Sequence, residues 1–294
     1  MWNVIKVITW VKAARPETLI ASVAPVVLGN VLSWKYGFLD VGKGAICLLL
    51  AVFLQVGCNF ANDYYDFLKG VDKPHRKGPP RLLAEGLVTP AGMFRAMIVS
   101  FFLAAVMGVL LIFTGKWWFS LIIIVSIISA YFYTGGKYPL AYHGWGDVFV
   151  FVFFGPVAVM GTFFVQTYNF SLDTFILSAC LGLLIDNILI INNCRDVEED
   201  TESKKRTSVV RLGRSFGIYH FTANGVMASL LPLGLLSMRY SPLISLNLLF
   251  LPLFLWFGLK LQLAEKGADY NKLLSLAALT VAIYTSMQCV SVLA

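Results

Sequence analysis

Two clusters of acidic and amide side chains stand at the edges of long apolar stretches of this chain. Their members are Asn62, Asp63, Asp66 and Asp72 in the first cluster, and Asn193, Asp196 and Asp200 in the second. Carboxylates beside hydrocarbon are costly unless a counter-charge such as a metal ion balances them. Magnesium favours a few carboxylates together with the phosphate oxygens of a substrate. The two clusters therefore predict a site for magnesium bound to a phosphorylated substrate.

The spacing within each cluster fits a helix. Asn62 and Asp66 stand at positions i and i+4, as do Asp196 and Asp200, so each pair shares one helical face. Asp63 is offset by one position and is expected to face another way. If the helices that carry the two pairs are neighbours, the side-chain oxygen atoms of both pairs are expected to face a common space. The alternative is that both clusters are ordinary surface acids at solvated loop ends.

Basic residues follow both clusters and would suit a diphosphate. The candidates for binding it are Arg76, Arg81, Lys137, Lys205 and Arg206. Arg76 and Arg81 flank a stiff Gly-Pro-Pro turn, and Lys205 lies about one helical turn beyond Asp200. Lys137 lies in an irregular loop, residues 134–146, whose glycines permit close approach of the backbone. Each base has the alternative of a simple topology signal on the cytoplasmic side of a membrane.

Asp147 and Tyr133 are the candidates for contacting an aromatic acceptor substrate. Asp147 heads an apolar stretch, where the alternative role is to stabilise a helix N-terminus. As a functional group, Asp147 would orient or deprotonate the acceptor. Tyr133 belongs to a set of aromatic residues near the acidic loops, whose ring faces would stabilise a carbocation.

Membrane helices must position these residues. The 294 residues are 58% hydrophobic and 13% charged, whereas soluble domains have about 25% charged residues. Apolar runs of about 20 residues mark membrane spans. Nine are expected, at residues 17–34, 43–62, 92–114, 117–133, 147–167, 172–193, 217–239, 242–261 and 272–293. The predicted fold is all-α, a single integral membrane domain over residues 1–294. Residues 1–13 are expected to form an amphipathic interfacial helix, with a disordered start as the alternative.

The distribution of charge predicts the orientation of this bundle. With nine spans, most Lys and Arg residues fall in loops on one side, and such loops face the cytoplasm. The N-terminus and both acidic clusters are therefore expected on the cytoplasmic face of a bacterial inner membrane, with the C-terminus outside. The net charge of +7 then reflects topology and phosphate binding, not nucleic acid. The five cysteines form no CxxC pair and are expected to be small buried apolar residues.

Taken together, these residues resemble the UbiA superfamily of intramembrane aromatic prenyltransferases. The motifs that carry the resemblance are Asn62-xxx-Asp66 with Asp72, and Asp196-xxx-Asp200 followed by Lys205-Arg206-Thr207. The superfamily usually has its third acid at the position of Gly70, and here Asp72 comes two residues later. In this position of its third acid, the sequence resembles the branch of the superfamily that acts on naphthoate. The same branch is suggested by Ala14-Arg15-Pro16-x-Thr18, by Tyr133-Thr134-Gly135-Gly136 and by residues 146–166.

The resemblance implies a nine-helix bundle with a central cavity that opens laterally to lipid. It implies two Mg²⁺ ions that bridge the aspartates and the diphosphate of a polyprenyl diphosphate. The implied reaction transfers the polyprenyl group to 1,4-dihydroxy-2-naphthoate, with loss of diphosphate and CO₂, to give a demethylmenaquinone for menaquinone biosynthesis. Catalysis would then rest on Asp66, Asp196, Asp200 and Lys205. The metal ligands would come from Asn62, Asp63, Asp66, Asp72, Asn193, Asp196 and Asp200.

Other functions stay open on the sequence alone. A related enzyme that uses 4-hydroxybenzoate, homogentisate or haem would share the same site. CDP-alcohol phosphotransferases also use membrane aspartates and Mg²⁺, but their Asp-Gly-x-x-Ala-Arg start is absent from this sequence. A cation transporter would place ionisable groups near the middle of the membrane. Asp186 is the only acid well inside a predicted span, and both clusters fall at one face.

Overall fold

The regular elements of the part that the structure describes are all helical, with no strand among those residues, which confirms the predicted all-α class. The structure is a computed structural model and describes residues 2–71, 78, 81–114, 119–238 and 240–294. Its α-helices are α1 (Trp2–Ala14), α2 (Ile20–Lys35), α3 (Val41–Leu68), α4 (Pro90–Thr114), α5 (Phe119–Phe132), α6 (Gly146–Val152), α7 (Ala158–Thr167), α8 (Leu172–Arg195), α9 (Val197–Glu202), α10 (Ser208–Leu212), α11 (Arg214–Leu230), α12 (Phe250–Gln262) and α13 (Gly267–Leu293). Shorter helical turns are η1 (Pro16–Thr18), η2 (Leu140–His143), η3 (Phe153–Val157), η4 (Leu231–Met238) and η5 (Pro242–Leu249).

Seven helical segments among the described residues are long and apolar enough to cross a membrane. They are Val41–Leu68, Pro90–Phe113, Gly146–Thr167, Leu172–Arg195, Arg214–Met238, Pro242–Gln262 and Gly267–Leu293. The segments Ile8–Thr18 and Ile20–Lys35 make an eighth if this pair, bent by 57°, counts as one span. The predicted fourth span corresponds to α5, whose described residues are apolar but too few for a full crossing. The expected count of nine spans is therefore approximate.

α3 carries the first acidic cluster at the end of a long apolar helix. The helix begins at an N-cap, Asp40, whose carboxylate accepts a hydrogen bond from the Lys43 backbone N–H at 3.1 Å. Near its middle, α3 packs tightly on α4. A Cβ added to Gly57 would lie 2.9 Å from the Phe101 ring, so only a glycine permits this approach. α4 therefore holds α3, and with it Asp66, in a fixed position.

α8 carries the second cluster through the centre of the bundle and is mostly buried. The bent segment α6–η3–α7 packs against it. Pro156 lies in the π-type turn η3, as expected of a residue that lacks an N–H and displaces the carbonyl four residues earlier. A Cβ on Gly155 would lie 2.7 Å from the Ser178 carbonyl and 2.9 Å from Gly182 Cα. This close contact sets the start of α6, and hence Asp147, beside α8.

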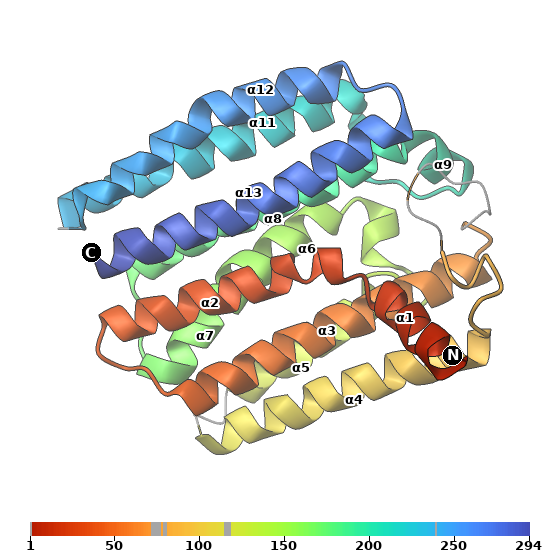
Figure 1. The fold of residues 1–294 in the computed structure, drawn as a ribbon, viewed down its shortest axis with the longest axis horizontal. Helices are drawn as coiled ribbons and strands as arrows, with labels where there is room; N and C mark the ends of the chain where they lie inside the picture. Colours follow the sequence, from red (N-terminus) through yellow and green to blue (C-terminus); the bar gives the residue numbers. More distant parts are fainter. Residues whose placement is uncertain (1, 72–77, 79–80, 115–118, 239) are drawn as a thin grey trace.

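The long helices lie roughly side by side, and the two chain ends lie at opposite ends of the bundle (Figure 1). α1 crosses the bundle at the end that also holds α9. Three apolar cores support this arrangement, one of which joins α2, α3, α4, α5 and α7. The largest joins α2, α7, α8 and α11 to α13, and a smaller one joins α1, α3 and α4. The carboxyl ends of α3 and α8 thus bring the two acidic clusters to the same end of the molecule.

Candidate functional site

A cavity of about 1420 Å³ runs through the bundle. Where α3 lines it, the wall is apolar at Cys47, Leu50 and Leu54 and becomes polar from Gln55 to Asp66. At about 1.5 Å per residue, Cys47 and Asp66 lie about 28 Å apart along the helix. That length is close to the thickness of the hydrocarbon core of a bilayer. The cavity therefore joins a polar end to a deep apolar interior.

The polar end of the cavity collects most of the side chains that the sequence singles out. It is lined by Asn62, Asp63, Asp66, Arg81, Tyr133, Asp147, Asn193, Asp196, Asp200 and Lys205. Both acidic clusters thus face one space, although they come from distant parts of the chain. Lys137 and Arg206 are exposed and do not line the cavity. Asp72 and Arg76 lie outside the described residues.

Asp66 is held by two neutral hydrogen-bond donors. Asn62 Nδ2 donates to Asp66 Oδ2 at 2.7 Å, as expected of residues that share one helical face. The Tyr142 hydroxyl donates to Asp66 Oδ1 at 2.6 Å. Asp66 is 3% exposed. These bonds fix the orientation of the carboxylate without neutralising its charge, which leaves that charge for a cation.

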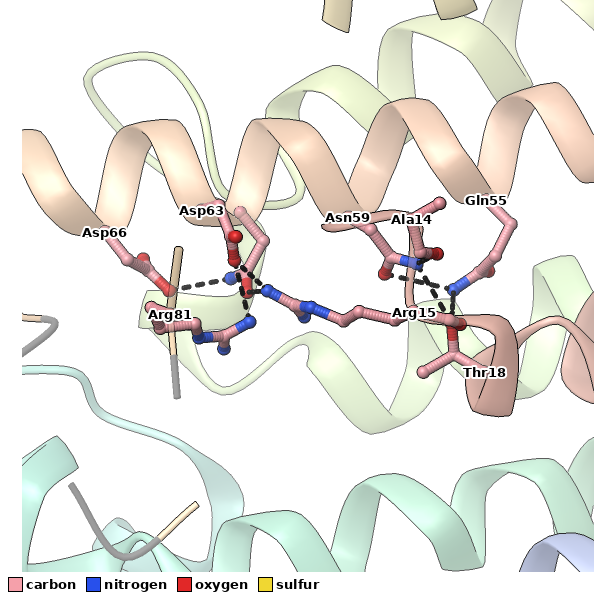
Figure 2. A network of polar contacts seen from close by, with 9 residues as sticks. Ala14, Arg15, Thr18, Gln55, Asn59, Asp63, Asp66 and Arg81 are labelled. Carbon is pink, nitrogen blue, oxygen red and sulfur yellow. Dashed lines mark hydrogen bonds and ion pairs between the residues drawn. The ribbon is translucent and has the colours of Figure 1, made fainter. Parts of the chain in front are cut away.

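Asp63 lies between two arginines from separate parts of the chain (Figure 2). Arg15 Nη2 forms an ion pair with Asp63 Oδ1 and also donates to Asn62 Oδ1 at 3.1 Å. Arg81 Nη1 donates to the same Asp63 oxygen at 2.9 Å. Arg15 reaches this position from a left-handed backbone conformation, φ 52°, that only a minority of non-glycine residues adopt. Two guanidinium groups share one carboxylate, so the trio carries a net positive charge.

The ion pairs of Asp63 with Arg15 and Arg81 predict that Asp63, unlike Asp66, contributes mainly to the stability of the folded protein. We expect Asp63→Asn to lower the free energy of unfolding by about 3 kcal/mol, because it removes the carboxylate charge that two partly buried guanidinium groups contact. The side chains of Asp63, Arg15 and Arg81 are only 3%, 19% and 14% exposed. Unfolding of the purified protein in detergent measures the effect.

The matched control is Glu198→Gln, which removes an exposed ion pair with Arg214. Because those two side chains are 54% and 37% exposed, the control is expected to cost less than about 1 kcal/mol. An Asp63→Asn protein as stable as the control would contradict the proposed role of the trio.

The second cluster is also paired, but in a different way. Arg195 forms a fork on Asp196, with Nε–Oδ1 at 2.6 Å and Nη2–Oδ2 at 2.9 Å. Lys205 Nζ donates to Asp200 Oδ1 at 3.1 Å. Burial raises the pKa of Asp200, and Lys205 opposes that rise. Burial alone would lower the pKa of Lys205, but the carboxylates of Asp200 and Asp66 outweigh it and raise that pKa. One ammonium group therefore responds to both acidic clusters.

Tyr142 in η2 bridges the two clusters. Its hydroxyl bonds Asp66, while its carbonyl accepts the backbone N–H of Arg206 at 3.0 Å. Its ring lies 4.2 Å from Lys69 Nζ and 5.9 Å from Lys205 Nζ, within cation–π range. Sequence reasoning missed this residue. The one available signal was its place in the irregular loop 134–146.

Asp147 and Tyr133 line the cavity close to each other. Asn193 Nδ2 donates to Asp147 Oδ1 at 3.5 Å, a long bond. A Cβ on Gly146 would lie 3.3 Å from the Tyr133 hydroxyl, which places that hydroxyl beside the start of α6. Burial raises the pKa of Tyr133 well above its usual value, so its hydroxyl stays protonated near neutral pH. The phenol is therefore available as a neutral hydrogen-bond donor.

The donor set at the polar end suits a hard divalent cation. Asp66, Asp196 and Asp200 contribute carboxylates, and Asp200 Oδ2 is buried with no hydrogen-bond partner among the described residues. An orphaned carboxylate oxygen of this kind suits a metal ligand. Within the same described residues, no three His, Cys, Asp or Glu side chains converge enough to hold a metal ion. Magnesium commonly takes one or two carboxylates and completes its shell with water or phosphate oxygens. The residues present thus fit Mg²⁺ that arrives with a diphosphate.

Comparisons with known proteins are consistent with this arrangement. The model of the UbiA prenyltransferase family matches residues 22–285. The chain is similar to the 1,4-dihydroxy-2-naphthoate octaprenyltransferase of Mycobacterium leprae (strain TN), with 39% identity over 205 residues that cover 69% of each protein. It is also similar to the 1,4-dihydroxy-2-naphthoate octaprenyltransferase of Escherichia coli (strain K12). The identity is 38% over 213 residues, which cover 69% of this chain and 68% of the relative.

A solved structure shares the fold. It is described as a UbiA homolog from Archaeoglobus fulgidus bound to DMAPP and Mg²⁺, and it matches with a TM-score of 0.69. The match covers 97% of this chain and 99% of that chain, at 14% sequence identity. At this identity the match shows the same arrangement of helices.

Proposed function

The chain belongs to the UbiA prenyltransferase family, and on this premise we propose that it transfers a polyprenyl group from a polyprenyl diphosphate to 1,4-dihydroxy-2-naphthoate. The products would be diphosphate, CO₂ and a prenylated 1,4-naphthalenediol, the hydroquinone form of a demethylmenaquinone, as expected of a step in menaquinone biosynthesis. The names of the relatives from M. leprae and E. coli support this acceptor. The observation that carries the proposal is that both acidic clusters and Lys205 face one cavity whose other half is apolar.

The polar end would bind the diphosphate. Asn62, Asp66, Asn193, Asp196 and Asp200 are the proposed ligands of two Mg²⁺ ions, with Asp72 added on the sequence alone. Bound Mg²⁺ would neutralise the negative charge that develops on the departing diphosphate. Arg81 and Lys205 are two of the cationic side chains that line the cavity, and they would bind diphosphate oxygens. Fixed charges aimed at a developing charge are commonly the largest contribution to catalysis.

The apolar half would hold the prenyl chain and exclude water. Its walls include Leu50, Leu54, Ile122, Phe153 and Val157. When the bond between the first prenyl carbon and the diphosphate oxygen breaks, the electron pair leaves with that oxygen. The allylic cation that remains is then attacked by an electron-rich carbon of the acceptor ring. A dry cavity favours that attack over hydrolysis.

Tyr133 and Asp147 are proposed to orient the aromatic acceptor. Both line the cavity, and the Tyr133 phenol would serve as a neutral hydrogen-bond donor. We place the polar end at the cytoplasmic face of the inner membrane, with the N-terminus inside and the C-terminus outside. The excess of Lys and Arg in the loops on that side supports the orientation. Polar substrates would enter from the cytoplasm, while the prenylated product stays in lipid.

Mass analysis of products tests the proposed acceptor. The purified protein, with Mg²⁺ and prenyl diphosphates of several lengths, receives 1,4-dihydroxy-2-naphthoate, 4-hydroxybenzoate or homogentisate. We expect a decarboxylated prenyl naphthalenediol from the first acceptor and little product from the other two. Preferential prenylation of 4-hydroxybenzoate or homogentisate would overturn the acceptor and leave the family assignment intact.

A further inference from the structure

α3 continues the polar face of the cavity below the acidic cluster and into the membrane. Gln55, Asn59, Asn62 and Asp66 follow one another at intervals of four, three and four positions, so they share one helical face. All of them line the cavity. The next lining residue toward the interior is Leu54, after which α3 presents only apolar side chains and Cys47 to the cavity. Gln55 therefore marks the boundary between the polar and apolar halves.

The amide groups of Gln55 and Asn59 face the turn between α1 and α2 (Figure 2). Gln55 Nε2 donates to Thr18 Oγ1 at 3.3 Å and to Asn59 Oδ1 at 3.4 Å. Asn59 Nδ2 donates to Thr18 Oγ1 at 2.9 Å and to the Ala14 carbonyl at 2.8 Å. The Ser22 hydroxyl donates to Gln55 Oε1 at 3.1 Å. Because a primary amide has two N–H groups, both side chains have used all their donors.

The amide oxygens keep accepting capacity. A side-chain carbonyl oxygen accepts two hydrogen bonds, and among the described residues Gln55 Oε1 and Asn59 Oδ1 each accept one. These two side chains therefore offer acceptors, and no donors, to whatever occupies the cavity. A polar group at this depth in a membrane protein needs a partner from protein, water or ligand.

The functional groups of the two substrates indicate which of them could donate hydrogen bonds to the oxygens of Gln55 and Asn59. The prenyl chain has no hydrogen-bonding atoms, and the diphosphate has only acceptors when it is ionised. The phenolic hydroxyl groups of the aromatic acceptor are the donors that remain. Along α3, Asn59 lies about 10 Å and Gln55 about 16 Å from Asp66. An acceptor ring whose hydroxyl groups reach Gln55 and Asn59 would therefore lie on the inner side of the diphosphate site. There it would be placed between the two amides and the prenyl carbon that bears the diphosphate.

We propose that Gln55 and Asn59 form the subsite that binds the hydroxyl groups of the aromatic acceptor. The inference rests on the proposed function and adds to it two residues that determine acceptor specificity. The carboxamide oxygens accept the ring O–H groups, while Thr18 and Ser22 hold the two amides in place. An acceptor without these hydroxyl groups leaves one accepting position on each carboxamide oxygen unused and binds more weakly.

The test removes the amide from the protein and the hydroxyl groups from the ligand, separately and together, in the manner of a double-mutant cycle. The KM for 1,4-dihydroxy-2-naphthoate is compared with the inhibition constant of 2-naphthoate, which lacks both hydroxyls. Gln55→Met keeps the length of the side chain and removes its amide. We expect the preference for the dihydroxy compound to fall about tenfold, the value of one hydrogen bond, with less than about a twofold change in the KM for prenyl diphosphate. Gln55→Ala gives the same readout if the Met variant does not fold.

Thr18→Val is the comparison variant. It removes a hydroxyl group that holds the two amides and also lines the cavity, but it keeps both amide oxygens. Thr18 Oγ1 already accepts from both amides and donates to the Arg15 carbonyl at 2.9 Å. Because Ser22 still bonds Gln55 and the Ala14 carbonyl still bonds Asn59, this variant is expected to lose less of the preference between the two naphthoates than Gln55→Met does. An unchanged preference in Gln55→Met, or an equal loss in Thr18→Val, would show that the amides only tie α3 to the α1–α2 turn. Failure of the wild-type protein to prenylate dihydroxynaphthoate would overturn the proposed function instead.

Discussion

Asp66→Asn is expected to reduce prenyl transfer by about 100- to 1,000-fold or more, while the protein stays folded. Asparagine keeps the size of the side chain but loses the charge that a metal ion on the diphosphate would require. The direct partners of Asp66 are Asn62 and the Tyr142 hydroxyl, which are both neutral, so the substitution breaks no direct ion pair among the described residues. Only the longer-range attraction of Lys69 and Lys205 is lost. The turnover number of the purified variant, alongside its unfolding temperature, measures the effect.

Asp40→Asn is the matched control for this experiment. Asp40 caps the other end of α3, and asparagine is an equally good N-cap. The control is expected to keep wild-type turnover. Near-normal turnover in Asp66→Asn would remove Asp66 from the proposed metal site. A parallel substitution, Asp196→Ala, is expected to abolish turnover too, but it also leaves the buried Arg195 without its ion-pair partner. Asp66 is therefore the cleaner position.

Removal of divalent cations is expected to stop the reaction, and added Mg²⁺ is expected to restore it. The physical reason is that the carboxylates of Asp66 and Asp200 face the same cavity as the proposed diphosphate site. Without a cation, these negative groups would repel the negative diphosphate. An activity assay in EDTA, followed by titration with Mg²⁺, measures this dependence.

A binding measurement checks the same prediction without turnover. Inorganic diphosphate is expected to raise the unfolding temperature of the protein only when Mg²⁺ is present, because a ligand stabilises the state it binds. In Asp66→Asn this stabilisation is expected to disappear. Full activity in EDTA, or equal stabilisation by diphosphate with and without Mg²⁺, would contradict the metal dependence.

The local parts of the site were open to prediction from sequence. The i and i+4 spacing of Asn62 and Asp66 predicts a shared face, and the hydrogen bond between them shows that face. The all-α class follows from apolar runs of membrane length. The number of spans follows less directly. The first span is bent at η1, and α5 has too few described residues for a full crossing. Hydropathy alone does not distinguish a short or broken helix from a full span.

The long-range parts of the site were not accessible to the same reasoning. Arg15 belongs to a motif that supports the family resemblance, but no local spacing links it to Asp63. Tyr142 joins the two acidic clusters because η2 folds back over the end of α3, an outcome of tertiary packing. Lys137 is a residue that the sequence suggested for the site but that the structure does not bring to it, because its side chain is exposed and does not line the cavity. Periodicity predicts which residues share a helical face, and the contacts between helices decide which faces meet.

The charge balance of the site also depends on those long-range contacts. Asp63 forms ion pairs with Arg15 and Arg81. Asp66, next to it on the helix, has only neutral hydrogen-bond donors as direct partners among the described residues. Neighbouring carboxylates on one helix thus have different surroundings. We infer that Asp63 positions the arginines, while Asp66 is the stronger candidate for a metal ligand. The stability and turnover experiments above separate the two roles.

The central claim is that both acidic clusters bind one diphosphate through shared Mg²⁺. It is tested most directly by an experimental structure with Mg²⁺ and an unreactive prenyl thiodiphosphate. We predict metal density in contact with Asp66 and with Asp196 or Asp200, the diphosphate between the two clusters, and the prenyl chain in the apolar half of the cavity. A diphosphate bound elsewhere, or metal held by only one cluster with the other turned away, would contradict the account.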